Sequence, residues 1–288
     1  MSDPQRLEAS SEDVELIKEW LKTQPHLPDN MEELVIRKFL FRCHHSLQVT
    51  KSSIDMYYTI RSNASEVFHN RDPLSTEIKE ASGVLDIVTL PTRTKDNYTI
   101  TMYRLRNHEP EKYKMNASMK YSYMIFDLMI GFDSLSNGDV AIVDMTGISL
   151  KHVAQVIYST LRLTTTYAQE AQPIKIKQFH VLNTLPIADK LFTFLKPVIK
   201  PEYLGCVYFH QANSSTLFDH VSRESIPVEY GGTAGPMESF LVECLKKFQD
   251  KRDYFLNEKV WTVDESKRPG GKSTNNLNVG SFKTLAID

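Results

Sequence analysis

Residues 172–209 constrain the fold of this chain more than any other stretch, because two apolar strands flank a helix that is too apolar for an exposed surface. Residues 176–182 and 206–209 have the composition of buried strands. Between them, Pro186 suits the first turn of a helix, and Pro197 interrupts that helix about three turns later. Its apolar side chains cover an arc of about 160°. This pattern predicts either a crossover helix packed on a sheet or a cover over an apolar interior that can touch a membrane.

The start of the chain has a different, helical pattern. Three amphipathic helices are predicted to begin after capping residues at Ser10 or Ser11, Asp29 or Asn30, and Ser46. The short loops between them indicate neighbouring helices that pack antiparallel. The sequence Asn70-Arg71-Asp72-Pro73 ends this pattern.

From Gly83 onward the hydrophobic period changes to that of alternating strands and helices. Strands are predicted at residues 84–90, 98–105, 140–145, 176–182 and 206–209, and helices at 121–132, 151–168, 187–199 and 237–248. Strand–helix–strand alternation is typical of an α/β layer fold with a mainly parallel sheet. The predicted organisation is a helical module, an α/β domain and a tail that packs on the body, at residues 1–73, 74–250 and 251–288.

The bulk properties favour a soluble intracellular protein. The net charge of −2 and the pI near 6.5 argue against a nucleic-acid partner, which normally requires a basic surface. Three widely spaced cysteines fit reduced thiols better than a disulfide framework. The polar N-terminus has no signal-peptide pattern, and no apolar run is long enough to span a bilayer. We therefore expect a cytoplasmic monomer.

The motifs of common enzymes and metal sites are missing from the sequence. It has no G-x-S-x-G, H-E-x-x-H or G-x-G-x-x-G pattern, and Gly270-Gly271-Lys272-Ser273 lacks the first glycine of a phosphate loop. His180 and His210 fall inside predicted strands and are interpreted as hydrogen-bonded histidines of the core or its rim. We expect a non-enzymatic protein without a cofactor or metal.

An excess of apolar residues is the positive signal for function. The helix at 121–132 is apolar almost all round, which predicts that it is buried on both sides. Its residues can form simple core. Together with the apolar helix at 187–199, they can also enclose a cavity, which is how proteins hold water-insoluble small molecules.

Several segments together resemble the CRAL-TRIO family of cytosolic lipid-transfer proteins, in its tocopherol-transfer-like invertebrate branch. The resemblance rests on KFLFRCHHSLQVTKSSIDMYY (38–58), NGDVAIVDMTGISL (137–150), IKIKQFHVLN (174–183), FLKPVIKPEYLGCVYFH (194–210), IPVEYGG (226–232) and the tail motifs VDESKRPG (263–270) and GSFKTLAID (280–288). It implies an N-terminal helical bundle module followed by a CRAL-TRIO β/α lipid-binding domain. The helix at 187–199 would be a mobile lid that opens at a membrane.

The resemblance also implies which side chains line an apolar cavity. The expected ligand-binding residues are Tyr121, Met124, Ile125, Leu128, Met129, Ile142, Val143, Thr164, Tyr167, Ala168, Gln172, Ile174, Phe179, Ile187, Leu191, Phe192, Leu195 and Ile199. Several polar tips among them suggest a ligand with one polar group on a long apolar body. Tocopherol, a retinoid, a carotenoid, a terpenoid or a similar lipid all remain open.

In the tocopherol branch a basic cluster near the lid binds phosphoinositide head groups. Lys175 and Lys177 match two of its positions, with Lys196 and Lys200 nearby. Other basic positions of the branch are not basic here. The expected R-A-R element reads Phe41-Arg42-Cys43, and the two basic positions after the lid are occupied by Glu202 and Cys206. Each lost basic residue weakens attraction to an anionic surface by about 1 kcal/mol. We expect weaker or differently placed phosphoinositide recognition.

These observations support two functions. The first is intracellular transfer of a hydrophobic ligand, with transient peripheral contact with membranes. The alternative is a phosphoinositide-responsive membrane adaptor that uses the same fold without transport. The resemblance of the tail also predicts that Phe282 and Leu285 dock on the body.

Overall fold

The computed structural model describes residues 10–184 and 188–270. Phe282 and Leu285 therefore lie outside the described residues. The described helices are α1 (Ser11–Lys22), α2 (Glu33–Arg42), α3 (Leu47–Asn63), α4 (Ser65–Phe68), α5 (Thr76–Val84), α6 (Met115–Phe132), α7 (Leu150–Val153), α8 (Tyr158–Thr166), α9 (Ala188–Leu195), α10 (Pro201–Leu204), α11 (Met237–Asp250) and α12 (Arg252–Leu256). The strands are β1 (Leu85–Thr89), β2 (Tyr98–Leu105), β3 (Gly138–Asp144), β4 (Ile176–Leu182) and β5 (Val207–Phe209).

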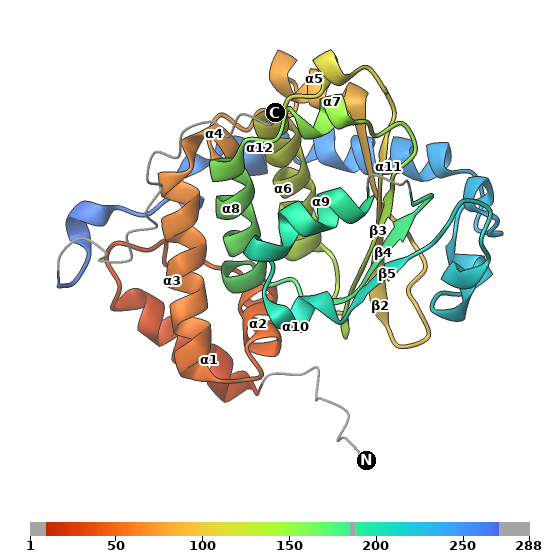
Figure 1. The fold of residues 1–288 in the computed structure, drawn as a ribbon. Coiled ribbons are helices and arrows are strands. Elements are labelled where there is room, and N and C mark those ends of the chain that lie inside the picture. Colours follow the sequence, from red (N-terminus) through yellow and green to blue (C-terminus); the bar gives the residue numbers. More distant parts are fainter. Residues whose placement is uncertain (1–9, 185–187, 271–288) are drawn as a thin grey trace.

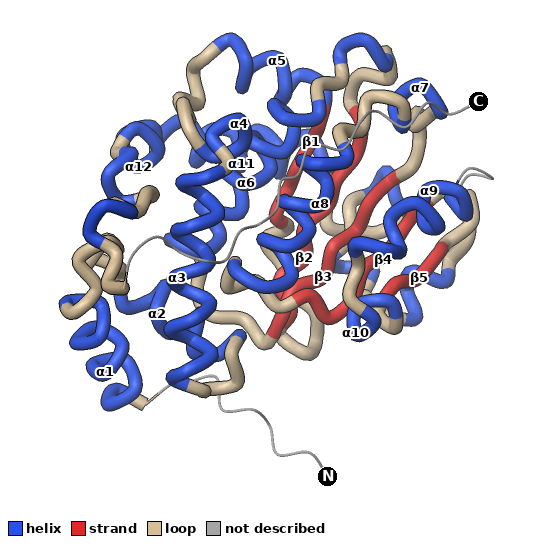
Figure 2. Tube along the Cα trace, turned by 60° about the vertical axis from the view of Figure 1, so that its left-hand side comes forward, coloured by secondary structure: helices blue, strands red, loops and turns tan. Residues whose placement is uncertain are grey.

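The strands form one sheet in the order β1-β2-β3-β4-β5. β1 is antiparallel to β2, and the remaining neighbours are parallel, as the sequence predicted. Parallel neighbours require crossover connections, and these are right-handed, so successive crossovers lie on the same face. Accordingly α6, α8 and α9 cover one face, while α11 lies behind the sheet (Figure 1). Figure 2 shows α8 and α9 lying across the strands.

The predicted strands are all present, whereas α5 and α10 were not predicted and the helix between β3 and β4 differs from its prediction. The bounds of β2 and β4 are those predicted. α9 ends at Leu195 and is followed by the 3-10 helix η3 (Lys196–Val198), which contains Pro197. The prediction of one helix at residues 151–168 is wrong. The structure has α7, then α8, then a π-helix, η2 (Tyr167–Ala171). The break before α8 is held by tertiary contact, because the Ile157 N–H points to the sulfur of Met115 at 3.0 Å.

The N-terminal helices share a core with the α/β domain. Phe39, Tyr57 and Phe68 from this module pack with Tyr123 of α6 and Tyr167 of η2 in one buried cluster. Tyr167 contacts the rings of Tyr57, Phe68 and Tyr123 at centroid distances of 5.6, 4.8 and 5.0 Å. α6 is therefore buried on both sides, as its composition predicted.

A buried ionic cluster lies inside this interface. Asp127 on α6 accepts hydrogen bonds from Arg61 of α3 at 2.9 and 2.6 Å and from Arg71 at 2.5 Å. All three side chains are almost completely buried. Trp261 covers both guanidinium groups at 4.6 and 4.3 Å from its ring centre, which brings the C-terminal segment into the same cluster.

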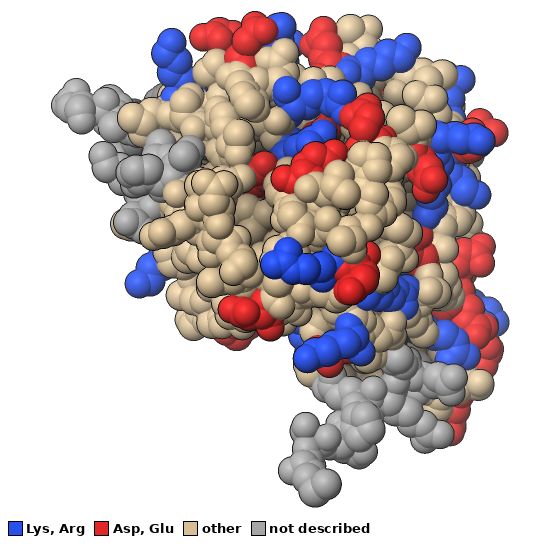
Figure 3. Space-filling view, turned by 90° about the vertical axis from the view of Figure 1, so that its right-hand side faces the viewer, with Lys and Arg blue, Asp and Glu red and all other residues tan. Residues whose placement is uncertain are grey.

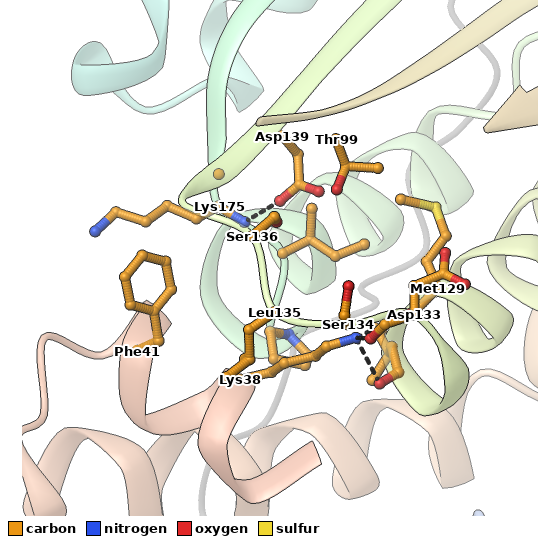
Figure 4. A pocket seen from close by; sticks show the side chains of 14 residues that line it. Lys38, Phe41, Thr99, Met129, Asp133, Ser134, Leu135, Ser136, Asp139 and Lys175 are labelled. Atoms are coloured by element: carbon orange, nitrogen blue, oxygen red, sulfur yellow. Dashed lines mark hydrogen bonds between the residues drawn. The ribbon is translucent and has the colours of Figure 1, made fainter. Parts of the chain in front are cut away.

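A lysine also connects the N-terminal helical module with the α/β domain. Lys38 on α2 donates to the carbonyl oxygens of Met129, Ile130 and Asp133 at 2.5, 3.0 and 2.6 Å, and thereby caps the C-terminus of α6 (Figure 4). The Met129 oxygen also accepts from the N–H of Asp133 at 3.3 Å, but the last carbonyls of a helix lack donors from a following turn, so a cation there is stabilising. Burial lowers the pKa of Lys38 to about 8.

Candidate functional site

Strands β3 and β4 are buried on one face and only partly covered on the other. Toward α11, Val140, Ile142 and His180 are 1%, 0% and 0% exposed. On the opposite face, Val143 and Phe179 keep part of their surface accessible, although each lies on a strand with a neighbour on both sides. The helices over this face therefore fill the space above it incompletely.

Helix α9 covers this partly filled face. Phe192 of α9 meets Phe209 of β5 edge to face at 5.5 Å, and Phe194 meets Tyr158 of α8 at 6.0 Å. Phe192, Phe194 and Leu195 are only partly buried. Phe209 is 45% exposed despite its contact with α9. An apolar helix thus lies over an apolar sheet face, and both keep accessible apolar surface.

The structure brings some of the expected ligand-binding residues together and separates others. Val143 and Phe179 lie on the sheet face beneath α9, and Phe192 and Leu195 lie on α9 itself. Ile142 points the opposite way and packs in the core on the α11 side. Successive strand residues point to opposite faces, so Ile142 and Val143 do not line one space.

Four expected residues on α6 pack elsewhere. Tyr121, Met124, Ile125 and Leu128 form a core cluster with Ile78, Ala81, Ile87, Ala117, Phe248 and Phe255. Tyr121 meets the ring of Phe248 at 5.6 Å, and its buried hydroxyl has no partner among the described residues. The structure does not bring this group together with Val143 and Phe179.

The remaining expected residues are spread around the same region. Tyr167 belongs to the core shared with the N-terminal module, and its hydroxyl accepts a hydrogen bond from Arg61 at 2.8 Å. Met129 and Ile174 line a small pocket of about 40 Å³ below β3 (Figure 4). Thr164 lies in α8, Ala168 lies in η2, and Gln172 and Ile199 directly follow η2 and η3. Ile187 and the side chain of Leu191 lie outside the described residues.

A basic cleft opens between the N-terminal module and β4, with a volume of about 640 Å³. Lys175, Lys177 and Lys200 line it, as does Arg42 at the end of α2. Burial and the nearby charges of Lys177 and Arg42 lower the pKa of Lys175. Positive charges are therefore held close together, and an anion bound among them would relieve their repulsion.

Acidic and neutral residues moderate the charge of this cleft. Glu170, Glu202 and Cys206 also line it, and the ammonium of Lys200 lies 3.3 Å from the carboxylate of Glu170. Lys196 is exposed and does not line the cleft. The structure thus places Glu202 and Cys206, the positions where basic residues were missing from the sequence pattern, inside the cleft itself.

Two residues of the cleft, Arg42 and His44, are not among those expected from the sequence. The resemblance indicates the loss of a basic residue in the segment around Arg42, yet Arg42 itself lines the cleft. The guanidinium of Arg42 donates to the carbonyl oxygen of Gln169 and lies 3.4 Å from the hydroxyl of Tyr203. The sequence did contain a signal for this part of the cleft, since Arg42 is basic and lies one position from where the family pattern has an arginine.

Comparison with known proteins identifies the family. Residues 85–232 match the CRAL/TRIO domain, and residues 6–78 match the UBA domain of Pinta-like proteins. The chain belongs to the CRAL-TRIO family. Members of this family bind and transfer lipophilic ligands.

Individual relatives are distant. The chain is 25% identical over 233 residues to human alpha-tocopherol transfer protein-like, a match that covers 79% of this chain and 66% of that protein. It is 22% identical over 232 residues to mouse clavesin-1, covering 79% of this chain and 65% of the relative. The chain thus spans about two thirds of the length of the curated relatives it matches.

The fold comparison agrees with the family. The crystal structure of Sfh5 superposes with a TM-score of 0.54 at 11% identity, covering 88% of this chain and 98% of that one. Among the described helices, none combines the length and apolar character that crossing a bilayer requires.

Proposed function

We propose that this CRAL-TRIO protein carries a hydrophobic small molecule between α9 and the sheet and exchanges it at a membrane surface. The unequal burial of the two sheet faces carries the proposal. On the face toward α11, Val140, Ile142 and His180 are fully buried, while Val143, Phe179 and Phe209 on the other face keep apolar surface accessible. A ligand that covered this surface would gain about 25 cal/mol per Å² of apolar area removed from water.

The exposed residues around α9 support contact with a membrane. Ile157 is 44% exposed and precedes Tyr158, which contacts α9, and Leu150 on α7 is 64% exposed. Exposed apolar side chains next to an amphipathic helix suit the interfacial region of a bilayer. Figure 3 shows positive and negative side chains interspersed on one face of the molecule, which therefore is not uniformly basic. The basic cleft is the local feature that would attract an anionic surface.

The proposed exchange needs no covalent chemistry. When α9 lifts from the sheet at a bilayer interface, lipid replaces water over Phe192 and Phe209, and most of the cost of exposing them is removed. The basic cleft, with Lys175, Lys177 and the exposed Lys196 nearby, would hold an anionic head group, including that of a phosphoinositide. This would orient α9 toward the bilayer.

The basic cleft also favours a second candidate, a phosphoinositide-responsive adaptor that transports nothing. Organic extraction of the purified protein, followed by mass spectrometry of the extract, separates the two. The carrier predicts one hydrophobic molecule per chain. A protein that yields no lipid in stoichiometric amount, but binds vesicles containing phosphoinositide, supports the adaptor.

A further inference from the structure

Residues 258–268, which we call the C-terminal strap, return across the N-terminal module. The strap begins after α12, and Trp261 within it covers the buried ionic cluster. Further along, the Asp264 N–H donates to the carbonyl oxygen of His26 at 2.9 Å, in the loop between α1 and α2. Figures 1 and 2 show the strap on the outer side of α3 and α8 on the inner side. The end of the described chain thus covers the N-terminal helices.

Three side chains of α3 receive the strap. Arg268 donates to both carboxylate oxygens of Asp55 at 2.8 Å and to the hydroxyl of Thr59 at 2.8 Å. The Val263 N–H donates to the hydroxyl of Ser62 at 2.7 Å. The side chain of Arg268 is only 8% exposed, so its charge-assisted bonds are sheltered from competing water. These contacts fix the strap along about two turns of α3.

The other side of α3 holds the π-helix η2. The hydroxyl of Ser53 lies 3.1 Å from the carbonyl oxygens of both Glu170 and Ala171 and donates to them. Near the end of α3, Arg61 donates to the hydroxyl of Tyr167 at 2.8 Å. Because Tyr167 begins η2 and Ala171 ends it, the whole π-helix is bonded to α3.

The helical period places the strap and η2 on opposite sides of α3. At about 100° per residue, the three residues that receive the strap span about 60° of the helix circumference. The residues that meet η2 span about 80°, and the centres of the two arcs lie about 170° apart. They are Ser53, Arg61 and Tyr57, whose ring stacks on that of Tyr167. α3 is therefore held between the strap and η2.

The π-helix in turn holds the segment that follows α9. The side chain of Gln169 binds the main chain at Val198 and Lys200. The ammonium of Lys200 also lies 3.3 Å from the carboxylate of Glu170. An unbroken series of contacts thus leads from Arg268 through α3 and η2 to the segment after α9.

We propose that the C-terminal strap is a clamp that limits the opening of α9, because it keeps α3 against η2 and η2 restrains the segment after α9. This regulation rests on the proposed carrier function, in which α9 lifts from the sheet. Release of the strap would leave the middle of α3 held from one side only, so η2 and the segment after α9 would open more often. Ligand exchange would then become faster through a change outside both the apolar space and the basic cleft.

Removal of Arg268 should loosen this clamp and leave the rest of the fold intact. Arg61 binds Asp127 of α6 at 2.6 Å, and this buried pair holds the end of α3 without Arg268. Asp55 keeps a second partner, Nε2 of His26 at 3.2 Å. The side chain of Asp55 is also 36% exposed, so water can solvate it when Arg268 is removed.

Hydrogen–deuterium exchange of the whole chain, compared between the wild type and Arg268→Ala, tests the clamp without any ligand. Exchange at residues 167–172 and 196–200 should rise at least about tenfold, the factor that corresponds to one lost hydrogen bond to a charged group. Exchange in α11 should not change. The matched control is Lys267→Ala, which removes an exposed ion pair with Asp264 and should behave like the wild type.

Unchanged exchange at residues 167–172 and 196–200 in Arg268→Ala would overturn the clamp. An equal rise in all segments, α11 included, would also overturn it, because the strap would then support only global stability. If Arg268→Ala fails to fold, Arg268→Lys decides by the same comparison. It keeps the charge but loses the fork of donors, so it should give a smaller rise in the same segments. A protein without lipid would refute the carrier function but leave this exchange test intact.

Discussion

The main-chain N–H of Lys200 donates to Oε1 of Gln169 at 2.6 Å, which fixes the segment after α9 to the π-helix η2. The amide nitrogen of the same side chain donates to the carbonyl oxygen of Val198 at 2.9 Å. Gln169 thus holds the segment that follows α9 at two residues, Val198 and Lys200. π-Helical turns are rare and often occur at functional sites, and here the turn carries the side chain that restrains the proposed lid.

Gln169→Ala should therefore loosen the segment at residues 196–200. Loss of the two hydrogen bonds should lower the free energy of local opening by about 1–3 kcal/mol. Faster amide exchange in this segment and faster transfer of a bound lipid to acceptor vesicles would be the measured effects. Gln155→Ala, on an exposed turn, is the matched control. Unchanged exchange in Gln169→Ala would show that Gln169 does not restrain α9.

The basic cleft should determine binding to anionic vesicles. The Lys175→Ala/Lys177→Ala double variant should lose about 2 kcal/mol of vesicle affinity at low salt, about 1 kcal/mol for each charge. The loss should shrink as salt is added. Cosedimentation with vesicles containing phosphoinositide measures it, and Lys79→Ala/Lys95→Ala removes two exposed charges elsewhere. Equal binding by both double variants would exclude the cleft as the membrane contact.

Conversion of Glu202 to lysine should have the opposite effect. Glu202 lines the cleft, and its replacement changes the local charge by two units without removing a buried contact, because the residue is exposed. Glu202→Lys should increase vesicle affinity by about 1–2 kcal/mol at low salt. Glu243→Lys on α11, away from the cleft, is the control. An increase of equal size in both would indicate a non-specific charge effect.

The sequence predicted the strands well because their signal is local. β2 and β4 have the predicted bounds, since runs of apolar and β-branched residues between turns are typical of strands in a buried sheet. It did not predict the breaks around α8. Those depend on contacts with distant residues, such as that between Ile157 and Met115, which no local pattern contains.

The candidate site was harder to predict than the fold. A helix as apolar as the second half of α6 gives no indication of which side faces a ligand, and the structure turns Tyr121 toward Phe248. In a strand, only alternate residues share a face, so Ile142 and Val143 cannot both line one space. Arg42 lies in the cleft, where its guanidinium donates to the carbonyl oxygen of Gln169 in η2, a contact across 127 residues that no local pattern contains.

The buried ionic cluster should be essential for stability. Asp127→Asn would leave Arg61 and Arg71 buried without a counter-charge, and should lower the free energy of unfolding by about 3–5 kcal/mol. Chemical denaturation followed by circular dichroism measures the change. Asp133→Asn removes a more exposed partner, that of Lys247, and should cost less than about 1 kcal/mol. Similar losses in the two variants would contradict this account of the cluster.

Asp139 should destabilise the fold as pH rises. Burial raises its pKa to about 6 from an ordinary value of 3.8, so the folded state favours the neutral carboxyl. Its stabilising contribution is therefore complete below about pH 4 and is lost as pH rises through 6. Asp139→Asn, which can still accept from the Lys175 N–H, should raise Tm at pH 7.5 and change it little at pH 4. The exposed Asp96→Asn is the control, and a pH-independent difference for Asp139→Asn would refute the shift.

Native mass spectrometry of the purified protein tests most directly whether a hydrophobic molecule occupies the space beneath α9. Val143→Trp should fill that space, whereas Val242→Trp adds the same bulk to an exposed position on α11. We predict one bound lipid per chain in the wild type and in Val242→Trp, and none in a folded Val143→Trp. A lipid that remains bound to folded Val143→Trp, or a wild-type protein that carries none, would contradict the account.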